Sequence, residues 1–449
     1  MAERPDEREA LVSGAATGRG YLSGLPSISR LTNGAALKGF VSVADQGVAS
    51  ATSFFLNVYL ARKLPVNDYG LFVVAYTVLY LAASLQDAVF GYPLLVIGSK
   101  EKGQGLKCYA SGIFIFQAAL SIAVAGLMIL GLLAAEAFGW AGQARALAVF
   151  VLFGLFYLGN QFLRRLLYLC GKEWMVLIVD AVLGIALFAA LFIYSRSSPP
   201  GLAVSNAALA VSAALSFITA VFFLRGVFTI KGLGLLRAVR ENLKFGKWLV
   251  AQNVCTWCTG QIYYLVSAAV LGMQAPAALK VCANLLAPLQ VLFQGIDSVM
   301  TLAISRRLDS GRARPFIIKA GAALVGFSAL YCVVLPLFSD EIIRLFYGPA
   351  YAGSGLIVWI FAVAFFFRSV AVVPNLVLIS MRATRDTFFI HLTTFFIGLA
   401  AMYPLLRWGQ VAGAAVGTVL LPYFFWAVFM LWRVSKVFPR YETLSGHGG

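Results

Sequence analysis

The stretch WMVLIVDAVLGIALFAALFIY, residues 174–194, carries one charged side chain, that of Asp180. The hydrocarbon core of a bilayer is about 30 Å thick and is crossed by about 20 apolar helical residues, so this stretch predicts a transmembrane helix. Eleven similar stretches accompany it, separated by short polar loops. The predicted spans are residues 38–61, 69–97, 107–134, 144–169, 174–194, 202–224, 247–271, 277–304, 316–338, 354–380, 387–406 and 411–432. We therefore expect an all-α polytopic membrane protein with twelve transmembrane helices.

The composition agrees with this interpretation. Hydrophobic residues make up 61% of the chain, charged residues 12%, and the mean hydropathy is +0.86. These values exclude a soluble globular enzyme. The net charge of +17 lies mainly in loops beside the spans, such as 225–247 and 306–319. There it favours anionic membrane lipids as partners and argues against nucleic-acid binding.

The distribution of Lys and Arg predicts the orientation. If the spans alternate from a cytoplasmic N-terminus, 27 of the 35 basic residues lie on the cytoplasmic side and Arg368 lies within a span. The positive-inside rule then predicts that both termini are cytoplasmic. The remaining seven are assigned to external loops: Arg62, Lys63, Arg145, Arg196, Lys280, Arg344 and Arg407.

The order of spans and loops predicts two lobes. Residues 1–35 combine acidic residues with Gly, Ser and Ala and are expected to form a disordered cytoplasmic tail. Residues 436–449 are expected to form a second cytoplasmic tail. A basic cytoplasmic linker, 227–245, divides an N-lobe of six spans (36–226) from a C-lobe of six (246–435). Because six is even, the lobes are parallel repeats, an arrangement typical of transporters with a central cavity and alternating access.

Polar side chains recur at helical spacing in four spans. They are Gln46, Ser50, Ser53 and Asn57 in the first, Tyr76, Tyr80 and Asp87 in the second, Tyr157, Gln161, Arg164 and Tyr168 in the fourth, and Gln290, Gln294, Asp297 and Thr301 in the eighth. Polar groups in hydrocarbon are costly and usually face a bundle interior or a wet cavity. Each stripe is thus expected to line a hydrophilic cavity, and the alternative is hydrogen bonding between helices. The candidate substrate-binding residues are Arg368, Gln46, Asn57, Tyr80, Asp87, Gln290, Gln294 and Asp297.

The charged residues within spans are few. Arg368 is 14 residues from both Ser354 and Arg382, near the bilayer midplane. A guanidinium facing a cavity suits phosphate, because its planar fork donates bidentate hydrogen bonds and stays charged. The alternative is a structural ion pair with a carboxylate of a neighbouring span. Arg164 and Arg165, near the cytoplasmic end of the fourth span, are interpreted as charges that set the topology.

Metal binding has little support in the sequence. Six cysteines lie in or at the ends of spans, and Cys255 and Cys258 form a CxxC pair within a predicted helix. No second pair and no histidine is near them to complete a metal site. We therefore predict no metal and no cofactor.

Three stretches resemble the polysaccharide-export branch of the multidrug, oligosaccharidyl-lipid and polysaccharide flippase superfamily. They are ADQGVASATSFFLNVYLARKLPVNDYGLF (44–72), LFYGPAYAGSG (345–355) and VAGAAVGTVLL (411–421), and the resemblance covers residues 36–435. It implies a two-lobed, twelve-helix flippase in the bacterial inner membrane. Such a protein moves an undecaprenyl-pyrophosphate-linked glycan to the external leaflet and works beside a polysaccharide polymerase and glycosyltransferases.

The resemblance also suggests ion coupling. Carboxylates in the first and fifth spans serve cation coupling in the multidrug branch, and Asp45 and Asp180 lie in those spans. Both are thus candidate H⁺ or Na⁺ sites.

Two other functions stay open. One is an ion-coupled multidrug or metabolite antiporter of the same fold. The other, a membrane enzyme such as a glycan polymerase or ligase, is disfavoured because the predicted external loops are short. The two histidines, His391 and His447, fall on the cytoplasmic side, and the sequence shows no nucleophile–base pair.

Overall fold

The computed structural model describes residues 28–197, 201–229, 235–308, 313–381 and 383–445, and every regular element in these ranges is helical. The α-helices are α1 (Ile28–Lys63), α2 (Val66–Gln86), α3 (Tyr92–Gly98), α4 (Gln104–Ala137), α5 (Ala141–Leu147), α6 (Phe150–Leu169), α7 (Glu173–Ser197), α8 (Leu202–Leu224), α9 (Leu235–Leu271), α10 (Gln274–Leu285), α11 (Ala287–Leu308), α12 (Ala313–Leu337), α13 (Ser339–Tyr347), α14 (Gly355–Ser380), α15 (Thr384–Ala415) and α16 (Leu421–Ser445). Two π-helical segments, η3 (Asp87–Gly91) and η5 (Val416–Leu420), and a 3₁₀ turn, η4 (Pro349–Tyr351), complete them.

Length and hydropathy confirm the all-α polytopic prediction. Within the described ranges, nine helices are long and apolar enough to cross a membrane, or ten if the bent pair α10 and α11 counts as one span. The axes of that pair differ in direction by 54°. The chain is thus a multi-pass membrane protein, and the number twelve stays a prediction.

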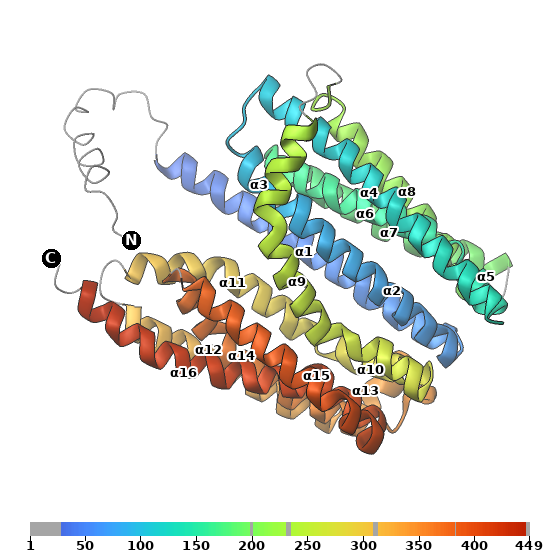
Figure 1. Ribbon diagram of the computed structural model, residues 1–449. Helices are drawn as coiled ribbons and strands as arrows, with labels where there is room; N and C mark the ends of the chain where they lie inside the picture. Colours follow the sequence, from blue (N-terminus) through green and yellow to red (C-terminus); the bar gives the residue numbers. More distant parts are fainter. Residues whose placement is uncertain (1–27, 198–200, 230–234, 309–312, 382, 446–449) are drawn as a thin grey trace.

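One of these nine helices joins two predicted spans. It extends over Arg385–Pro439, but its backbone leaves helical geometry at Gln410, where φ is 46° and ψ is −128°. In Figure 1, α16 runs back beside α15. The turn is tight enough that a side chain at Gly413 would collide with the carbonyl of Leu405. The break falls between the predicted spans 387–406 and 411–432.

The helices form two bundles whose ends approach each other on one side only. Figure 1 shows α1 to α8 in one bundle and α10 to α16 in the other. The ribbons lie close together where α2, α10 and α13 meet. They diverge toward the start of α1 and the end of α16. We refer to these bundles as the N-lobe and the C-lobe; the residue boundaries predicted for lobes, linker and tails stay predictions, and residues 1–27 and 446–449 lie outside the described part.

Hydrogen bonds hold the lobes together at the close end. Arg62 Nη1 donates to the carbonyl of Leu345 at 3.0 Å, and Asn284 Nδ2 lies 3.4 Å from the carbonyl of Phe54. The rings of Tyr69 and Tyr351 also meet edge to face, with centroids 6.3 Å apart. We call this end the latch. On the predicted topology it is the external end of the molecule.

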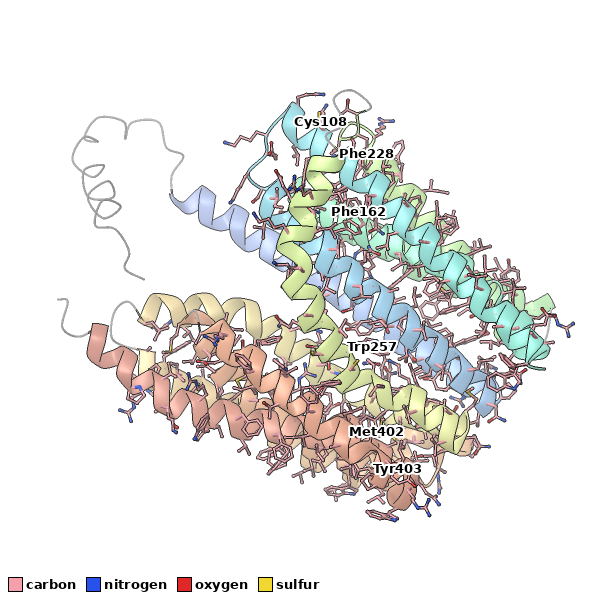
Figure 2. The ribbon with its side chains drawn as sticks, viewed as in Figure 1. Cys108, Phe162, Phe228, Trp257, Met402 and Tyr403 are labelled. Atoms are coloured by element: carbon pink, nitrogen blue, oxygen red, sulfur yellow. The ribbon has the colours of Figure 1, made fainter. Side chains whose placement is uncertain are left out.

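Helix α9 belongs to both bundles. It begins at Leu235, inside the predicted linker, and contacts the N-lobe through two side chains: Asn253 Nδ2 donates to the carbonyl of Ser84 at 2.9 Å, and Trp257 Nε1 to that of Thr77 at 3.2 Å. Figure 2 shows Trp257 where α9 passes from one lobe to the other. Further along, the Tyr263 hydroxyl donates to the carbonyl of Gly398 in the C-lobe at 2.6 Å.

Candidate functional site

Two adjoining cavities lie between the lobes. The Lys280 cavity, of about 500 Å³, reaches Asn57, Lys280 and Asn284; the Arg368 cavity, of about 550 Å³, reaches Arg368 and Asp87. Both are lined by Tyr80, Tyr157, Gln161, Gln261, Gln290 and Tyr423. Because they share these residues, the two cavities adjoin, and both are lined by polar and aromatic side chains.

The structure brings some of the predicted binding residues to this space and leaves others outside it. Asn57, Tyr80, Asp87, Gln290 and Arg368 line one or both cavities. Gln46 and Gln294 are exposed but line neither cavity. Asp297 lies in α11, and its side chain is outside the described part of the structure.

Asn57 also forms a hydrogen bond between helices, which is the alternative interpretation of the polar stripe in the first span. Its Nδ2 donates to the carbonyl of Ser53 at 2.8 Å, and its Oδ1 accepts from the Tyr69 hydroxyl at 3.0 Å. This side chain therefore connects α1 with α2 while it lines the Lys280 cavity. A cavity-facing residue can thus hold the bundle together as well.

Arg368 lies among neutral partners. Its Nη1 donates to Gln290 Oε1 at 2.7 Å and to the Tyr423 hydroxyl at 3.0 Å. The guanidinium carbon is also 5.2 to 5.5 Å from the ring centroids of Phe293, Phe365 and Tyr423. A guanidinium has five N–H donors. Within the described residues, Arg368 forms no ion pair, so its Nε and Nη2 remain available to a ligand.

Asp87 does not pair with Arg368. Its Oδ2 lies 2.8 Å from Arg165 Nη2, and the Arg165 guanidinium lies 5.3 Å from the centroid of the Tyr92 ring. Asp87 begins the π-helical segment η3, where its carboxylate occupies the space that a side chain at Gly91 would need. π-Bulges of this kind are common at functional sites.

A second ionic cluster lies inside the N-lobe. Arg164 Nη2 lies 3.0 Å from Asp45 Oδ2 and 2.7 Å from Asp180 Oδ2, and the Tyr168 hydroxyl donates to Asp45 Oδ2 at 2.7 Å. Asp45 is fully buried, whereas Arg164 and Asp180 line the Lys280 cavity. The structure therefore joins the two candidate coupling carboxylates, which come from α1 and α7, through a guanidinium from α6.

The role of Arg164 differs from the sequence interpretation. We expected a charge that sets the topology, but the side chain is 17% exposed and forms ion pairs with two carboxylates. The signal was present in the stripe Tyr157, Gln161, Arg164 and Tyr168. Of these, Tyr157, Gln161 and Arg164 line a cavity, and Tyr168 reaches Asp45.

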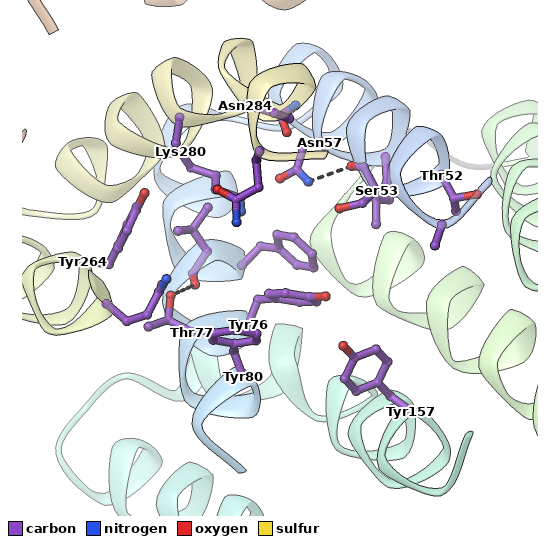
Figure 3. A pocket seen from close by; sticks show the side chains of 18 of the residues that line it. Thr52, Ser53, Asn57, Tyr76, Thr77, Tyr80, Tyr157, Tyr264, Lys280 and Asn284 are labelled. Carbon is purple, nitrogen blue, oxygen red and sulfur yellow. Dashed lines mark hydrogen bonds between the residues drawn. The ribbon is translucent and has the colours of Figure 1, made fainter. Parts of the chain in front are cut away.

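Lys280 requires a correction. We assigned it to an external loop, but it lies within α10 and lines the cavity named after it. Figure 3 shows its side chain beside Asn284, on the side of the cavity opposite Tyr76 and Tyr157. In the part of the chain that the structure describes, its ammonium has no hydrogen-bond acceptor and no ion-pair partner.

Metal-ligand clusters are absent from the described residues, where no group of three His, Cys, Asp or Glu side chains could hold an ion. Cys255 and Cys258 are free thiols on α9. The absence of a metal or cofactor stays a prediction.

Comparison with known proteins bears out the resemblance. Residues 59–354 match the family model described as polysaccharide biosynthesis protein. No curated protein matches the chain.

Several solved structures share the fold. The lipid II flippase MurJ in an inward closed conformation is 14% identical, with a TM-score of 0.73 over 90% of each chain. An inward-facing multidrug resistance MATE family transporter of the MOP superfamily is 13% identical, with a TM-score of 0.69 over 92% of this chain and 100% of that one. A MOP superfamily transporter from Pyrococcus furiosus is 13% identical, with a TM-score of 0.64 over 89% and 95%. At these identities the similarity establishes the MOP-superfamily fold.

Proposed function

The chain belongs to the polysaccharide biosynthesis protein family, and from this membership and the cavity we propose that it is a lipid-linked oligosaccharide flippase. Its substrate is an undecaprenyl-pyrophosphate-linked glycan, moved from the cytoplasmic to the external leaflet of the bacterial inner membrane for surface polysaccharide synthesis. The supporting observation is Arg368, a cation that faces an interlobe cavity and has no carboxylate partner among the described residues.

Arg368 suits a pyrophosphate for a geometric reason. Gln290 and Tyr423 hold one end of the guanidinium, and its other N–H groups are left to form bidentate hydrogen bonds. An Arg at mid-bilayer costs at least about 2.5 kcal/mol on insertion scales. An anionic head group that binds there offsets this cost during transport.

The latch supports an alternating-access cycle. It joins α1 to α13 through Arg62 and Leu345, and to α10 through Phe54 and Asn284. On the predicted topology the lobes are then closed outside, and the substrate enters from the cytoplasmic side. Release to the external leaflet requires these hydrogen bonds to break.

Asp45 and Asp180 support coupling to an ion gradient. Two carboxylates face one guanidinium, that of Arg164, so the cluster can take up one further positive charge, either H⁺ or Na⁺. Uptake would weaken the pairing with Arg164, which lines the substrate cavity. This arrangement connects the ion site to the site that we propose for the glycan.

A multidrug or metabolite antiporter is the second candidate, because the MATE transporters share the fold. The cavity favours the flippase. Among the described residues neither Lys280 nor Arg368 forms an ion pair, so both present positive charge there, and like charge repels cationic drugs. Anionic membrane lipids, a polysaccharide polymerase and glycosyltransferases remain the proposed partners.

The test of the phosphate site is export of surface polysaccharide by cells that carry only a variant copy, measured beside membrane abundance. We expect Arg368→Ala to abolish export and Arg368→Lys to impair it strongly, because Lys cannot form the bidentate geometry. Arg407→Ala, at an exposed arginine that contacts Tyr403, serves as the matched control. Normal export by Arg368→Ala at normal abundance would refute the phosphate site.

Thiol labelling tests the orientation. In a background without the native cysteines, Lys63→Cys and Arg407→Cys should react with a membrane-impermeant reagent added outside intact cells, and Arg314→Cys should not. The reverse pattern would place the latch at the cytoplasmic end.

A further inference from the structure

Lys280 is a cation in a membrane-spanning region, and the transport scheme above assigns no ligand to it. Its side chain lines the Lys280 cavity, and no described carboxylate, carbonyl or hydroxyl accepts a hydrogen bond from its ammonium. An unpaired charge away from water costs several kcal/mol. The charge is tolerable if an anion arrives with the substrate.

Among the described residues, no carboxylate forms an ion pair with Lys280. Asp180 lines the same cavity, but its carboxylate lies 2.7 Å from Arg164 Nη2. Asp45, the other member of that cluster, is fully buried and lines neither cavity. The described lining of the Lys280 cavity therefore has more positive than negative charge.

The remaining lining combines aromatic faces with amides. Tyr76, Tyr80 and Tyr157 border the cavity; the Tyr80 side chain is 47% exposed, and the Tyr76 and Tyr157 ring centroids are 6.3 Å apart. Aromatic faces offer an apolar surface to the C–H faces of a sugar, and amides both donate and accept hydrogen bonds. Asn284 lies one turn from Lys280. Its Nδ2 donates to the Tyr347 hydroxyl and to the carbonyl of Phe54, so its Oδ1 can accept a hydrogen bond from a sugar hydroxyl.

The Lys280 and Arg368 cavities are separate but adjoining. Lys280 and Gln290, the residue that holds Arg368, are ten positions apart along the bent α10–α11 pair. At about 1.5 Å per residue they are at most about 15 Å apart along the helices. A pyrophosphate bound at Arg368 can thus extend its first sugars toward Lys280 and the tyrosines.

We propose that Lys280 binds a carboxylate carried by the sugars of the substrate, so that the protein prefers lipid-linked glycans that contain an acidic sugar such as a uronic acid. This inference rests on the proposed flippase function and assigns the Lys280 cavity to the glycan. The pyrophosphate offers the same oxyanion chemistry. We favour the sugar because Arg368, in the adjoining cavity, already provides free donors for the phosphates.

The experiment measures dissociation constants of the purified full chain in lipid nanodiscs. The ligands are undecaprenyl pyrophosphate alone, the same lipid with a neutral diglucoside, and two versions in which the first or the second glucose is replaced by glucuronate. The variants are Lys280→Gln, which removes the charge, and Lys280→Arg, which keeps it. Lys63→Gln is the matched control, since Lys63 is exposed and lines neither cavity.

We expect Lys280→Gln to weaken binding of at least one glucuronate lipid by tenfold or more, the loss that a charge-assisted hydrogen bond represents. Binding of the neutral diglucoside lipid and of the bare lipid should change by less than about twofold. Lys280→Arg should retain the preference for the acidic sugar, and Lys63→Gln should bind all four lipids as the native chain does.

Two results would overturn the inference. An equal loss for all four lipids would show that Lys280 contacts the pyrophosphate, and unchanged binding of all four would show that it contacts no ligand. A native chain that binds none of the four lipids would instead refute the flippase proposal itself. Thermal unfolding of Lys280→Gln in the same nanodiscs checks that the variant is folded.

Discussion

Both lobes contribute basic residues to the cavity lining, but among the described residues those of the N-lobe are ion-paired and those of the C-lobe are not. In the N-lobe, Arg164 meets Asp45 and Asp180, and Arg165 meets Asp87. In the C-lobe, Arg368 has neutral partners and Lys280 has none among the described residues. The paired charges are part of the folded structure, whereas we propose that the other two bind anionic groups of the substrate. Four substitutions test this distinction.

The largest effect is expected at Arg164. Arg164→Met leaves two buried carboxylates without their partner, and removing one member of a buried ion pair costs about 3–5 kcal/mol. The amount of folded protein, measured by fluorescence-detected size exclusion, should fall sharply. The triple variant that adds Asp45→Asn and Asp180→Asn should recover most of it. Native abundance of Arg164→Met alone would show that the cluster is not structural.

A smaller loss of stability, with a larger effect on transport, is expected at the two carboxylates proposed to couple transport to an ion gradient. Asp180→Asn leaves Arg164 paired with Asp45, so we expect a cost of about 1.5–3 kcal/mol, the net value of one hydrogen bond to a charged group. Transport in reconstituted vesicles should lose its dependence on an imposed H⁺ or Na⁺ gradient. If the Asp45→Asn and Asp180→Asn variants both keep gradient-dependent transport, neither residue takes part in coupling.

At Lys280 we expect the substitution to increase the stability of the protein. Lys280→Met replaces an unpaired ammonium with an apolar side chain of similar length, so the free energy of unfolding should rise by about 1 kcal/mol. Thermal unfolding in detergent without ligand measures this gain. The same substitution at the exposed control, Lys63→Met, should leave the unfolding temperature unchanged. Destabilisation by Lys280→Met would mean that the ammonium has a partner in the folded protein.

The smallest effect is expected at Arg165. This side chain is 36% exposed and its partner Asp87 is 27% exposed, so water screens the pair. Arg165→Met should cost about 0.5 kcal/mol in the same assay. A cost as large as that of Arg164→Met would remove the distinction between a buried and a hydrated pair.

The sequence predicts the helices because the bilayer imposes a length on them. The apolar stretch 174–194 lies within α7, and the break between 387–406 and 411–432 appears at Gln410. The ionic contacts depend instead on residues distant in the chain. Arg164 is 119 positions from Asp45, and no local pattern fixes their approach.

The cavity residues were only partly predictable for the same reason. Helical spacing identifies a polar face, and Tyr80 and Gln290 follow it into the cavities. Spacing does not predict which part of the polar face lies opposite the other lobe. Gln46 and Gln294 are on such faces but lie outside both cavities. The sequence places Lys280 wrongly because positive charge near the end of a span is typical of a loop, whereas α10 extends on both sides of this residue.

Helix α9 has a mechanical consequence for the transport cycle. Hydrogen bonds hold its middle at two places: Asn253 and Trp257 fix one part to α2, and Tyr263 fixes the next part to α15. If the lobes rotate against each other, a helix held in this way must bend between these two places. Gly260 lies there, with no atom within 4 Å of the position where a side chain would begin, and glycine is the residue that resists helix distortion least. The extent to which the lobes can rotate is then limited by how far α9 bends at Gly260.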